Sequence, residues 1–202
     1  TPHETYQAQA NIMYLSPDYQ AEIYPELSQA IGWNKVMRRN IGFIEAYKAG
    51  CDICASIDDD NIPYDNWGKN IIVGQERSIP VYTTYLVAFD PLQMTDHLDL
   101  WHRGYPLELI EPSFDIHFVE EKLIKVLFQA DLWDGDPDVD AICRLQIKPK
   151  GLRLGLKKPF SSVEYMPFNS QNTFIAREAL PYYMVLPYVG RMDDIWGGYI
   201  AQ

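Results

Sequence analysis

The sequence predicts a single α/β domain over residues 1–202, with a mixed, mostly parallel β-sheet flanked by helices. The length suits one domain with its own core, and neither repeats nor flexible linkers divide the chain. A segment of helical spacing runs almost directly into a short apolar segment that begins at residue 51. Further strand-like and helix-like segments follow, which is the order expected of a mixed α/β sheet.

The first expected helix covers residues 34–49. Asn34 has a side chain that can cap a helix N-terminus, and Gly50 is typical of a helix C-terminal stop. Apolar side chains recur near helical spacing at Met37, Ile41, Ile44 and Tyr47. The next segment, CDICASI at 51–57, has the apolar character of a central parallel strand that is covered on both faces.

Six more elements are expected downstream. Strands are predicted at 79–89, 113–118 and 172–176, where β-branched and aromatic residues gather. Helices are predicted at 120–133, at 176–186 with an interruption at Pro181, and at 194–202.

Charge and cysteine content exclude several classes of function. With 28 acidic and 17 basic residues the net charge is -11, which repels nucleic acid and anionic membranes. No run approaches the roughly 18 apolar residues of a membrane helix, and the opening residues do not resemble a signal peptide. Three cysteines, an odd number, favour free thiols, so we expect a cytoplasmic protein without a membrane segment. Cys51 and Cys54 form a CxxC pair, for which we favour a structural interpretation over a redox or zinc site.

Three adjacent aspartates, Asp58, Asp59 and Asp60, come at the end of the strand expected at 51–57. Ligands bind at the carboxyl ends of strands in open α/β sheets, which places these carboxylates where function is usual. A divalent cation such as Mg²⁺ or Mn²⁺ would relieve their repulsion and bring in substrate phosphates. The same residues suit a solvated turn, and the local sequence does not separate the two interpretations.

Two further acidic groups lie downstream. Residues 134–140 carry aspartates at alternate positions but lack the glycine and glutamate of a calcium-binding EF-hand loop. We expect a polar loop that lines a sugar pocket, with the ring of Trp133 as a flat surface for a pyranose, while a solvated turn is the alternative. Asp193 and Asp194 adjoin Trp196 and two glycines, where a carboxylate can act as a general base or cap the final helix.

Arginines are few in this acidic chain, so each is a candidate for binding an anionic ligand. Arg38 and Arg39 adjoin each other, and Arg103 lies in WHRGYP. Guanidinium groups bind phosphates through bidentate hydrogen bonds. Their value as phosphate ligands depends on sharing a pocket with the aspartates.

Several stretches run in order through most of the chain. They are RRNIGFIEAYKAG with IDDDNIP, then LWHRGYPLELI, GDPDVDAICRL, PFNSQNTFIAREAL and RMDDIWGGYIAQ. Together they resemble the glycosyltransferases of the GT-A fold, and within that group the STELLO-like proteins and the reversibly glycosylated polypeptides. A bare DxD is common by chance, whereas the longer stretches are unusual. Their combination makes the resemblance fairly specific.

The resemblance implies a metal-dependent transfer of a sugar from a nucleotide diphosphate, most often UDP, to a glycan or other hydroxyl acceptor. It implies that Asp60 binds Mn²⁺ or Mg²⁺, with Asp58 as a further ligand near the ribose and Asp59 near the donor sugar. Asp194, beside Asp193, corresponds to the base of an inverting enzyme. The nucleotide-side residues are Arg38, Arg39, Asn40 and Arg103. The residues expected around the sugar and acceptor are Trp133, Asp136, Asp138, Asn169, Arg191 and Trp196.

The chain also departs from the family pattern. Gly197 stands where relatives often carry arginine, and no histidine follows His117 to act as a late metal ligand. The family's first strand and base-binding segment are missing, so either the given sequence lacks its first strands, as a domain of a larger protein could, or the fold is abbreviated. Two alternatives to a transferase stay open: a UDP-sugar mutase or self-glycosylating protein, and a non-catalytic partner that binds a nucleotide sugar.

Overall fold

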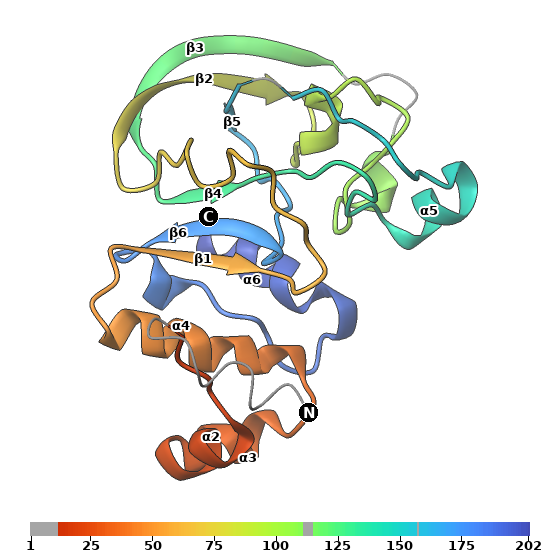
Figure 1. Ribbon diagram of the computed structural model, residues 1–202. Helices are drawn as coiled ribbons and strands as arrows, with labels where there is room; N and C mark the ends of the chain where they lie inside the picture. Colours follow the sequence, from red (N-terminus) through yellow and green to blue (C-terminus); the bar gives the residue numbers. More distant parts are fainter. Residues whose placement is uncertain (1–11, 111–114, 157) are drawn as a thin grey trace.

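The computed structural model describes residues 12–110, 115–156 and 158–202 and shows a mixed α/β protein with two small sheets (Figure 1). The first sheet lies in the middle of the molecule above α4, and the second sheet arches over the first. The strands of the first sheet, in spatial order, are β1 (Ile53–Ile57), β6 (Asn172–Ala176) and β4 (Phe128–Ala130). Those of the second sheet are β3 (Ile116–Lys125), β2 (Glu76–Thr84) and β5 (Ser161–Ser162).

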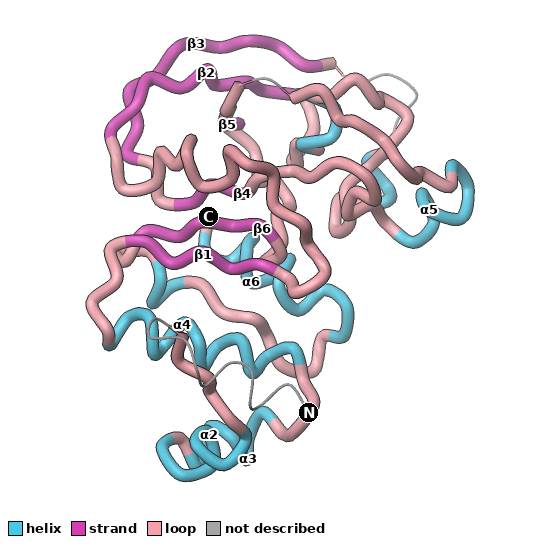
Figure 2. Tube along the Cα trace, viewed as in Figure 1, coloured by secondary structure: helices cyan, strands magenta, loops and turns pink. Residues whose placement is uncertain are grey.

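Helices in the described residues are short, and long irregular segments connect them (Figure 2). The α-helices are α2 (Pro17–Ile23), α3 (Pro25–Ile31), α4 (Arg39–Lys48), α5 (Ala141–Ile147) and α6 (Asp193–Ala201). The 3₁₀ helices are η1 (Val36–Arg38), η2 (Pro91–Met94), η3 (Leu107–Leu109), η4 (Leu180–Tyr182) and η5 (Gly190–Met192). Loops therefore supply many of the side chains around any ligand site.

The sheets are mostly antiparallel, so the mostly parallel sheet predicted from the sequence is wrong. β6 pairs antiparallel with both β1 and β4, and Ile175 lies opposite Cys54 on one side and Phe128 on the other. β2 pairs antiparallel with β3 and parallel with the two residues of β5. Among the described strands β1 has β6 as its single neighbour, so it is an edge strand with Ile57 half exposed, and the central position predicted for 51–57 is wrong. An apolar run indicates that a strand is buried, but it does not indicate whether a distant partner strand pairs parallel or antiparallel.

The helix expected at 34–49 is confirmed in its main part as α4, but its start differs. Asn34 has the left-handed φ of 53° and does not cap the helix, because η1 separates it from the first residue of α4. Ile41 is fully buried on the inner face of α4, as the apolar spacing predicts. Gly50 follows the last turn with φ 79°, so its predicted role as the C-terminal stop is confirmed.

The segment 120–133 forms strands, so the helix predicted for it is wrong. β3 pairs with β2 along its whole length, from Ile116 opposite Thr84 to Lys125 opposite Glu76. The strand expected at 113–118 is confirmed from Ile116 onwards, while residues 113 and 114 lie outside the described residues. The strand expected at 79–89 is confirmed up to Thr84. A mixture of charged and apolar residues such as EEKLIK suits an exposed strand or a helix, and only pairing with β2 decides between them.

Near the C-terminus two predictions are confirmed and one is wrong. Residues 172–176 form β6 as expected. The helix predicted for 176–186 is reduced to the short η4, which contains Pro181. The helix predicted for 194–202 is α6, and Asp193 is its first residue, not its cap, because Met192 occupies the cap position.

Two apolar cores stabilise the molecule. The first joins α4, β6 and the segment after η4, where Ile175 and Val185 are fully buried. The second surrounds α5 and includes Leu100 and Cys143. The three cysteines are free, as expected. Among the described residues, no helix has both the length and the apolar character needed to cross a membrane.

Gly197 packs too closely on its neighbours to carry a side chain. A Cβ at this position would lie 2.0 Å from the carbonyl oxygen of Met184, far inside the contact distance of real atoms. Gly42 in α4, in contrast, has open space where a Cβ would lie. An arginine side chain at position 197 therefore has no room in this fold.

We expect Gly197→Ala to lower the free energy of unfolding by about 1–3 kcal/mol, because the added methyl group overpacks the contact with Met184. Gly42→Ala is the matched control, and it should raise stability by about 0.5–1 kcal/mol through better helix propensity. Denaturant unfolding measures both changes. Equal effects of the two substitutions would contradict the close packing of α6 on the chain at Met184.

Candidate functional site

A cleft of about 1830 Å³ runs along the first sheet. Its walls come from the loop after β1, from β4 with the loop that follows it, and from the chain between α5 and β6. Six of the residues predicted from the sequence to form a site line this cleft: Asp60, Trp133, Asp136, Asp138, Asn169 and Arg191. The cleft is therefore the place where these side chains can meet a ligand.

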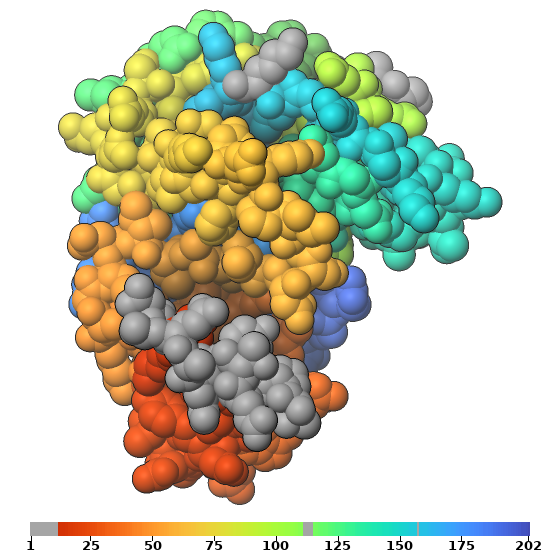
Figure 3. Space-filling view, viewed as in Figure 1, coloured from red at the N-terminus to blue at the C-terminus, as the bar shows by residue number. Residues whose placement is uncertain are grey.

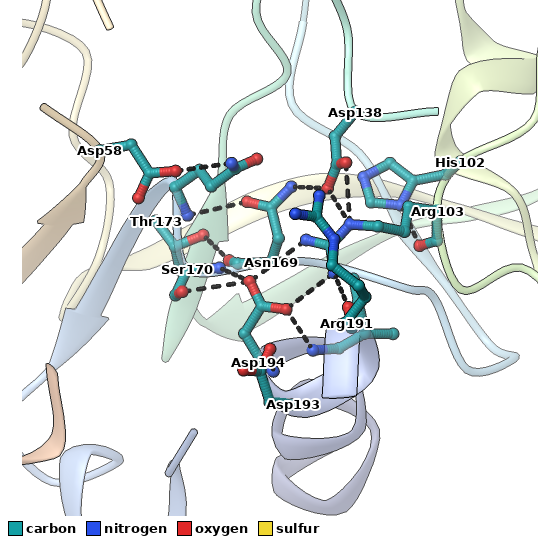
Figure 4. A network of polar contacts seen from close by, with 12 residues as sticks. Asp58, His102, Arg103, Asp138, Asn169, Ser170, Thr173, Arg191, Asp193 and Asp194 are labelled. Carbon is teal, nitrogen blue, oxygen red and sulfur yellow. Dashed lines mark hydrogen bonds and ion pairs between the residues drawn. The ribbon is translucent and has the colours of Figure 1, made fainter. Parts of the chain in front are cut away.

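Three consecutive residues before β6 bind one aspartate each from the three acidic groups, and we call residues 169–171 the hub loop (Figure 4). Asn169 Nδ2 donates to Asp138 Oδ2 at 2.8 Å, and Gln171 Nε2 donates to Asp58 Oδ2 at 2.6 Å. The backbone N–H and the hydroxyl of Ser170 both donate to Asp194 Oδ2, at 3.0 and 3.1 Å. Acidic groups far apart in sequence are thus held together by one loop.

The hub loop is itself held rigidly. The backbone N–H of Gln171 donates to Asn169 Oδ1 at 2.9 Å, and Thr173 Oγ1 donates to the Asn169 carbonyl at 2.6 Å. Ser56 in β1 donates its hydroxyl to the Ser170 carbonyl at 2.6 Å. Because Ser56, Ser170 and Thr173 are nearly fully buried, these hydrogen bonds compete little with water.

Arg103 bridges two of the aspartates bound to the hub loop. Its Nε lies 2.8 Å from Asp138 Oδ1, and its Nη1 lies 3.0 Å from Asp194 Oδ1. Burial lowers the pKa of Arg103, but the hydrogen bonds and charges of the two carboxylates outweigh burial and leave the pKa above its ordinary value. Arg103 does not line the cleft, so its described role is to compensate buried carboxylates. The predicted phosphate contact stays a prediction.

Asp194 is a buried, strongly hydrogen-bonded carboxylate. Burial raises its pKa, but the hydrogen bond and charge of Arg103, together with the two donors of Ser170, lower the pKa below its ordinary value. A carboxylate with so many donors accepts a further proton poorly. Burial raises the pKa of its neighbour Asp193, which accepts a hydrogen bond from the Asp194 backbone N–H at 2.9 Å. By proton affinity Asp193 is the better base of the pair, and neither residue lines the cleft.

The three aspartates after β1 have different surroundings. Asp58 is half buried and is bound by Arg39 as well as by Gln171. Asp59 and Asp60 are exposed, and only Asp60 lines the cleft. Within the described residues, no three histidine, cysteine, aspartate or glutamate side chains gather as a metal-binding group. Mg²⁺ takes only one or two protein carboxylates and keeps several waters. Asp60 alone could therefore hold such an ion, while Asp58 forms an ion pair with Arg39.

The remaining nucleotide-side candidates bind other parts of the protein. Arg38 stacks on Trp33, with 3.6 Å from its Cζ to the ring centroid, and donates to Gln20 and to two backbone carbonyls. Arg39 also donates to the Ser170 carbonyl at 2.8 Å. Asn40 exchanges two hydrogen bonds of 2.8 Å with the backbone of Val185. None of these three side chains lines the cleft, so their nucleotide contacts stay predictions.

Of the residues expected around the sugar and acceptor, all but Trp196 line the cleft. Trp133 donates its indole N–H to the Asp136 carbonyl at 2.9 Å, which orients the ring at the cleft. Asp136 also forms an ion pair with Arg144. Trp196 is half exposed on α6, outside the cleft, although it was expected in the same pocket.

Sequence reasoning missed Ser170 and Gln171 as members of the site. Both lie in the run NSQN, a series of polar residues directly before the buried strand β6. Polar groups beside a buried strand must find hydrogen-bond partners, and that requirement was the available signal. The comparisons add no family to this description, because the chain matches no protein-family model and no curated protein.

Asp90, at the start of η2, is a second buried carboxyl near the site. It is 2% exposed and accepts backbone N–H groups of Leu92 at 3.0 Å and of His102 at 3.1 Å. Burial raises the pKa of Asp90 to about 7, although the two backbone hydrogen bonds act in the opposite direction. Among the described residues no cation pairs with it. Asp90 thereby holds the chain directly before Arg103.

The first prediction for the site concerns Arg103. We expect Arg103→Met to lower the free energy of unfolding by about 3–5 kcal/mol, because it leaves Asp138 and Asp194 buried without a compensating charge. Arg77→Met is the control, since the exposed Arg77 donates only to the side chain of Gln75. Denaturant unfolding at pH 7 compares the variants, and similar losses in both would contradict a stabilising role of the Arg103 bridge.

The second prediction concerns pH. The folded-state pKa of Asp90, about 7, lies above the unfolded value of about 4, so its contribution to stability is fully present below pH 4 and is lost as pH rises through 7. We expect Asp90→Asn, which cannot ionise, to gain roughly 4 kcal/mol over the unaltered protein between pH 4 and pH 8. Unfolding measured at several pH values gives this difference. A difference that does not change with pH would exclude the raised pKa.

Proposed function

We propose that the protein is a metal-dependent glycosyltransferase of the GT-A type, which transfers a sugar from a nucleotide diphosphate such as UDP to a hydroxyl acceptor with inversion. The observation that carries this proposal is the convergence of Asp58, Asp138 and Asp194 on the hub loop. These aspartates come from the separate acidic stretches by which the sequence resembles that family. Unrelated acidic turns have no reason to share one rigid loop beside a cleft.

In this proposal Asp60 holds the Mn²⁺ or Mg²⁺, because its carboxylate is exposed, lines the cleft and has no described partner. The bound ion supplies stabilisation of the negative charge that develops on the departing diphosphate. Asp58 positions the start of the same loop through Arg39 and Gln171. Hard carboxylate oxygens are the donors that these cations prefer, so the residues present fit the ion.

The sugar and acceptor would lie farther along the cleft. Trp133 presents an oriented aromatic ring, and Asn169 and Asp138 also line the cleft. A hydroxyl acceptor needs a proton acceptor as it attacks. The raised pKa of Asp193 suits that role better than the lowered pKa of Asp194. Because neither side chain lines the cleft, this choice rests on proton affinity alone, and Asp194 is left to orient α6 on the hub loop.

The test is metal-dependent binding of UDP. We expect Asp60→Asn to weaken Mn²⁺-dependent UDP binding at least tenfold, because it removes the charged ligand of the ion. Asp59→Asn is the matched control, since Asp59 is also exposed but does not line the cleft, and it should change UDP binding less than twofold. Calorimetric titrations with Mn²⁺ and with a chelator measure both. Absence of metal-dependent UDP binding in the unaltered protein would overturn the proposal.

A second function, binding of a nucleotide sugar without transfer, is favoured by one observation. Asp194 is saturated by donors, and neither it nor Asp193 lines the cleft. Product analysis separates the possibilities: transfer to an added acceptor supports the transferase, and conversion of the UDP-sugar alone supports a mutase. Metal-dependent binding with neither product supports the non-catalytic function.

A further inference from the structure

His102 lines the cleft but has no role in the reaction proposed above. Its neighbourhood, next to the projecting segment that begins with α5, lies at the right of Figure 3. The residue is 2% exposed, so its ring is almost fully removed from bulk water. Burial lowers the pKa of His102 below its ordinary value, although the charge of Asp138 acts in the opposite direction. The imidazole is therefore neutral at pH 7.

One ring nitrogen of His102 is committed to the backbone, which fixes the state of the other. Nδ1 lies 2.7 Å from the carbonyl oxygen of Arg103. Because a carbonyl oxygen only accepts hydrogen bonds, Nδ1 of the neutral ring carries the proton and Nε2 carries a lone pair. Within the described parts of the chain, Nε2 has neither a hydrogen bond nor an ion pair. Nε2 can therefore accept a proton without breaking an existing contact.

The unpartnered nitrogen of His102 is open to the cleft. Of the described side chains, those of Thr84, Trp101 and Gln171 each have a fully enclosed polar atom without a partner, and His102 is not among them. Its Nε2 is therefore in contact with solvent, although the residue as a whole is buried. The open space beside His102 is the cleft that it lines, so a ligand in the cleft can reach Nε2.

Backbone pairing brings His102 beside Asp138, another residue of the cleft lining. His102 and Val139 form an isolated antiparallel bridge, and the backbone N–H of Arg103 donates to the Asp138 carbonyl at 2.9 Å. Figure 4 shows the imidazole beside the Asp138 carboxylate, whose charge is the largest influence that raises the pKa of His102. Arg103 and Asn169 hold this carboxylate in place. A proton taken up by His102 would therefore be stabilised by a fixed negative charge.

We propose that His102 is the proton acceptor of the cleft and takes the proton of the hydroxyl group that attacks the donor sugar. This inference deepens the proposed function and rests on it for the reaction. His102 takes the place of Asp193, which was preferred on proton affinity alone, because His102 lines the cleft and Asp193 does not. A neutral imidazole that is held by one nitrogen and open at the other has the form that a general base requires.

In the proposed step the O–H bond of the acceptor breaks, and its proton passes to His102 Nε2. The acceptor oxygen forms a bond to the anomeric carbon of the sugar, while the bond from that carbon to the diphosphate breaks on the opposite face. The electron pair of the broken bond leaves with the diphosphate. The charges of Asp138 and Asp194 stabilise the imidazolium, and burial and the charge of Arg103 favour its return to the neutral ring by loss of the proton to water.

The test uses a variant that removes the proton acceptor but keeps the structural contact. In His102→Asn the amide N–H can still donate to the Arg103 carbonyl, while nothing replaces Nε2. His97→Gln is the matched control, because His97 Nε2 lies 3.0 Å from the Arg153 carbonyl and His97 does not line the cleft. Release of UDP from UDP-glucose, UDP-galactose and UDP-xylose is measured with Mn²⁺, with water and free sugars as acceptors. We expect kcat to fall at least 100-fold in His102→Asn and less than twofold in His97→Gln, with Mn²⁺-dependent UDP binding changed less than twofold in both.

The role of His102 and the proposed function fail in different ways. Turnover by His102→Asn at the rate of the unaltered protein overturns the role of His102 and leaves the transferase proposal standing. Metal-dependent UDP binding without any turnover in the unaltered protein overturns the role of His102 and supports the non-catalytic function. Absence of metal-dependent UDP binding in the unaltered protein overturns the transferase proposal and, with it, the role of His102.

A measurement on the unaltered protein covers the case in which His102→Asn does not fold. The ¹⁵N chemical shifts of the imidazole nitrogens report which of them carries a proton. We expect a protonated Nδ1 and an unprotonated Nε2 for His102 at pH 7.5, because the Arg103 carbonyl requires a donor at Nδ1. The opposite tautomer, or a ring protonated on both nitrogens, would overturn the proposal.

Discussion

Hydrogen bonds from the hub loop to three aspartates are the constraint on which the rest of the structure depends. Asn169, Ser170 and Gln171 each bind one carboxylate, and each carboxylate belongs to a different part of the chain. The loop directly precedes β6, the central strand of the first sheet, so its position is set by the main core. A buried carboxylate without donors would be costly, so the loop and its aspartates stabilise one another.

The distribution of cations follows from the same constraint. Arg39 and Arg103 compensate carboxylates on either side of the hub loop, and their positions are determined by that task. A protein of net charge -11 can keep a concentrated acidic site only if buried charges are paired. Arg153, Lys158 and Arg191, in contrast, are exposed residues of the cleft lining.

How much of the fold and the site could be predicted depends on the range of the interaction. The body of α4, its end at Gly50 and the strand β6 were predictable, because local spacing and a residue that tolerates a positive φ determine them. The strand character of 120–125 was not, because it depends on pairing with β2. Likewise Asn169 was expected at the site, while Ser170 and Gln171 were not, since hydrogen bonds to distant aspartates leave no periodic pattern.

By itself the sequence determined the composition of the site: three acidic stretches, few arginines, and a polar run before a buried strand. It also determined which short segments are apolar enough to enter a core. Only the tertiary structure decided which carboxylates are paired and which one faces the cleft, as Asp58 and Asp60 illustrate. The physical reason is that burial and charge compensation depend on neighbours brought together from all parts of the chain, and residue type alone does not specify those neighbours.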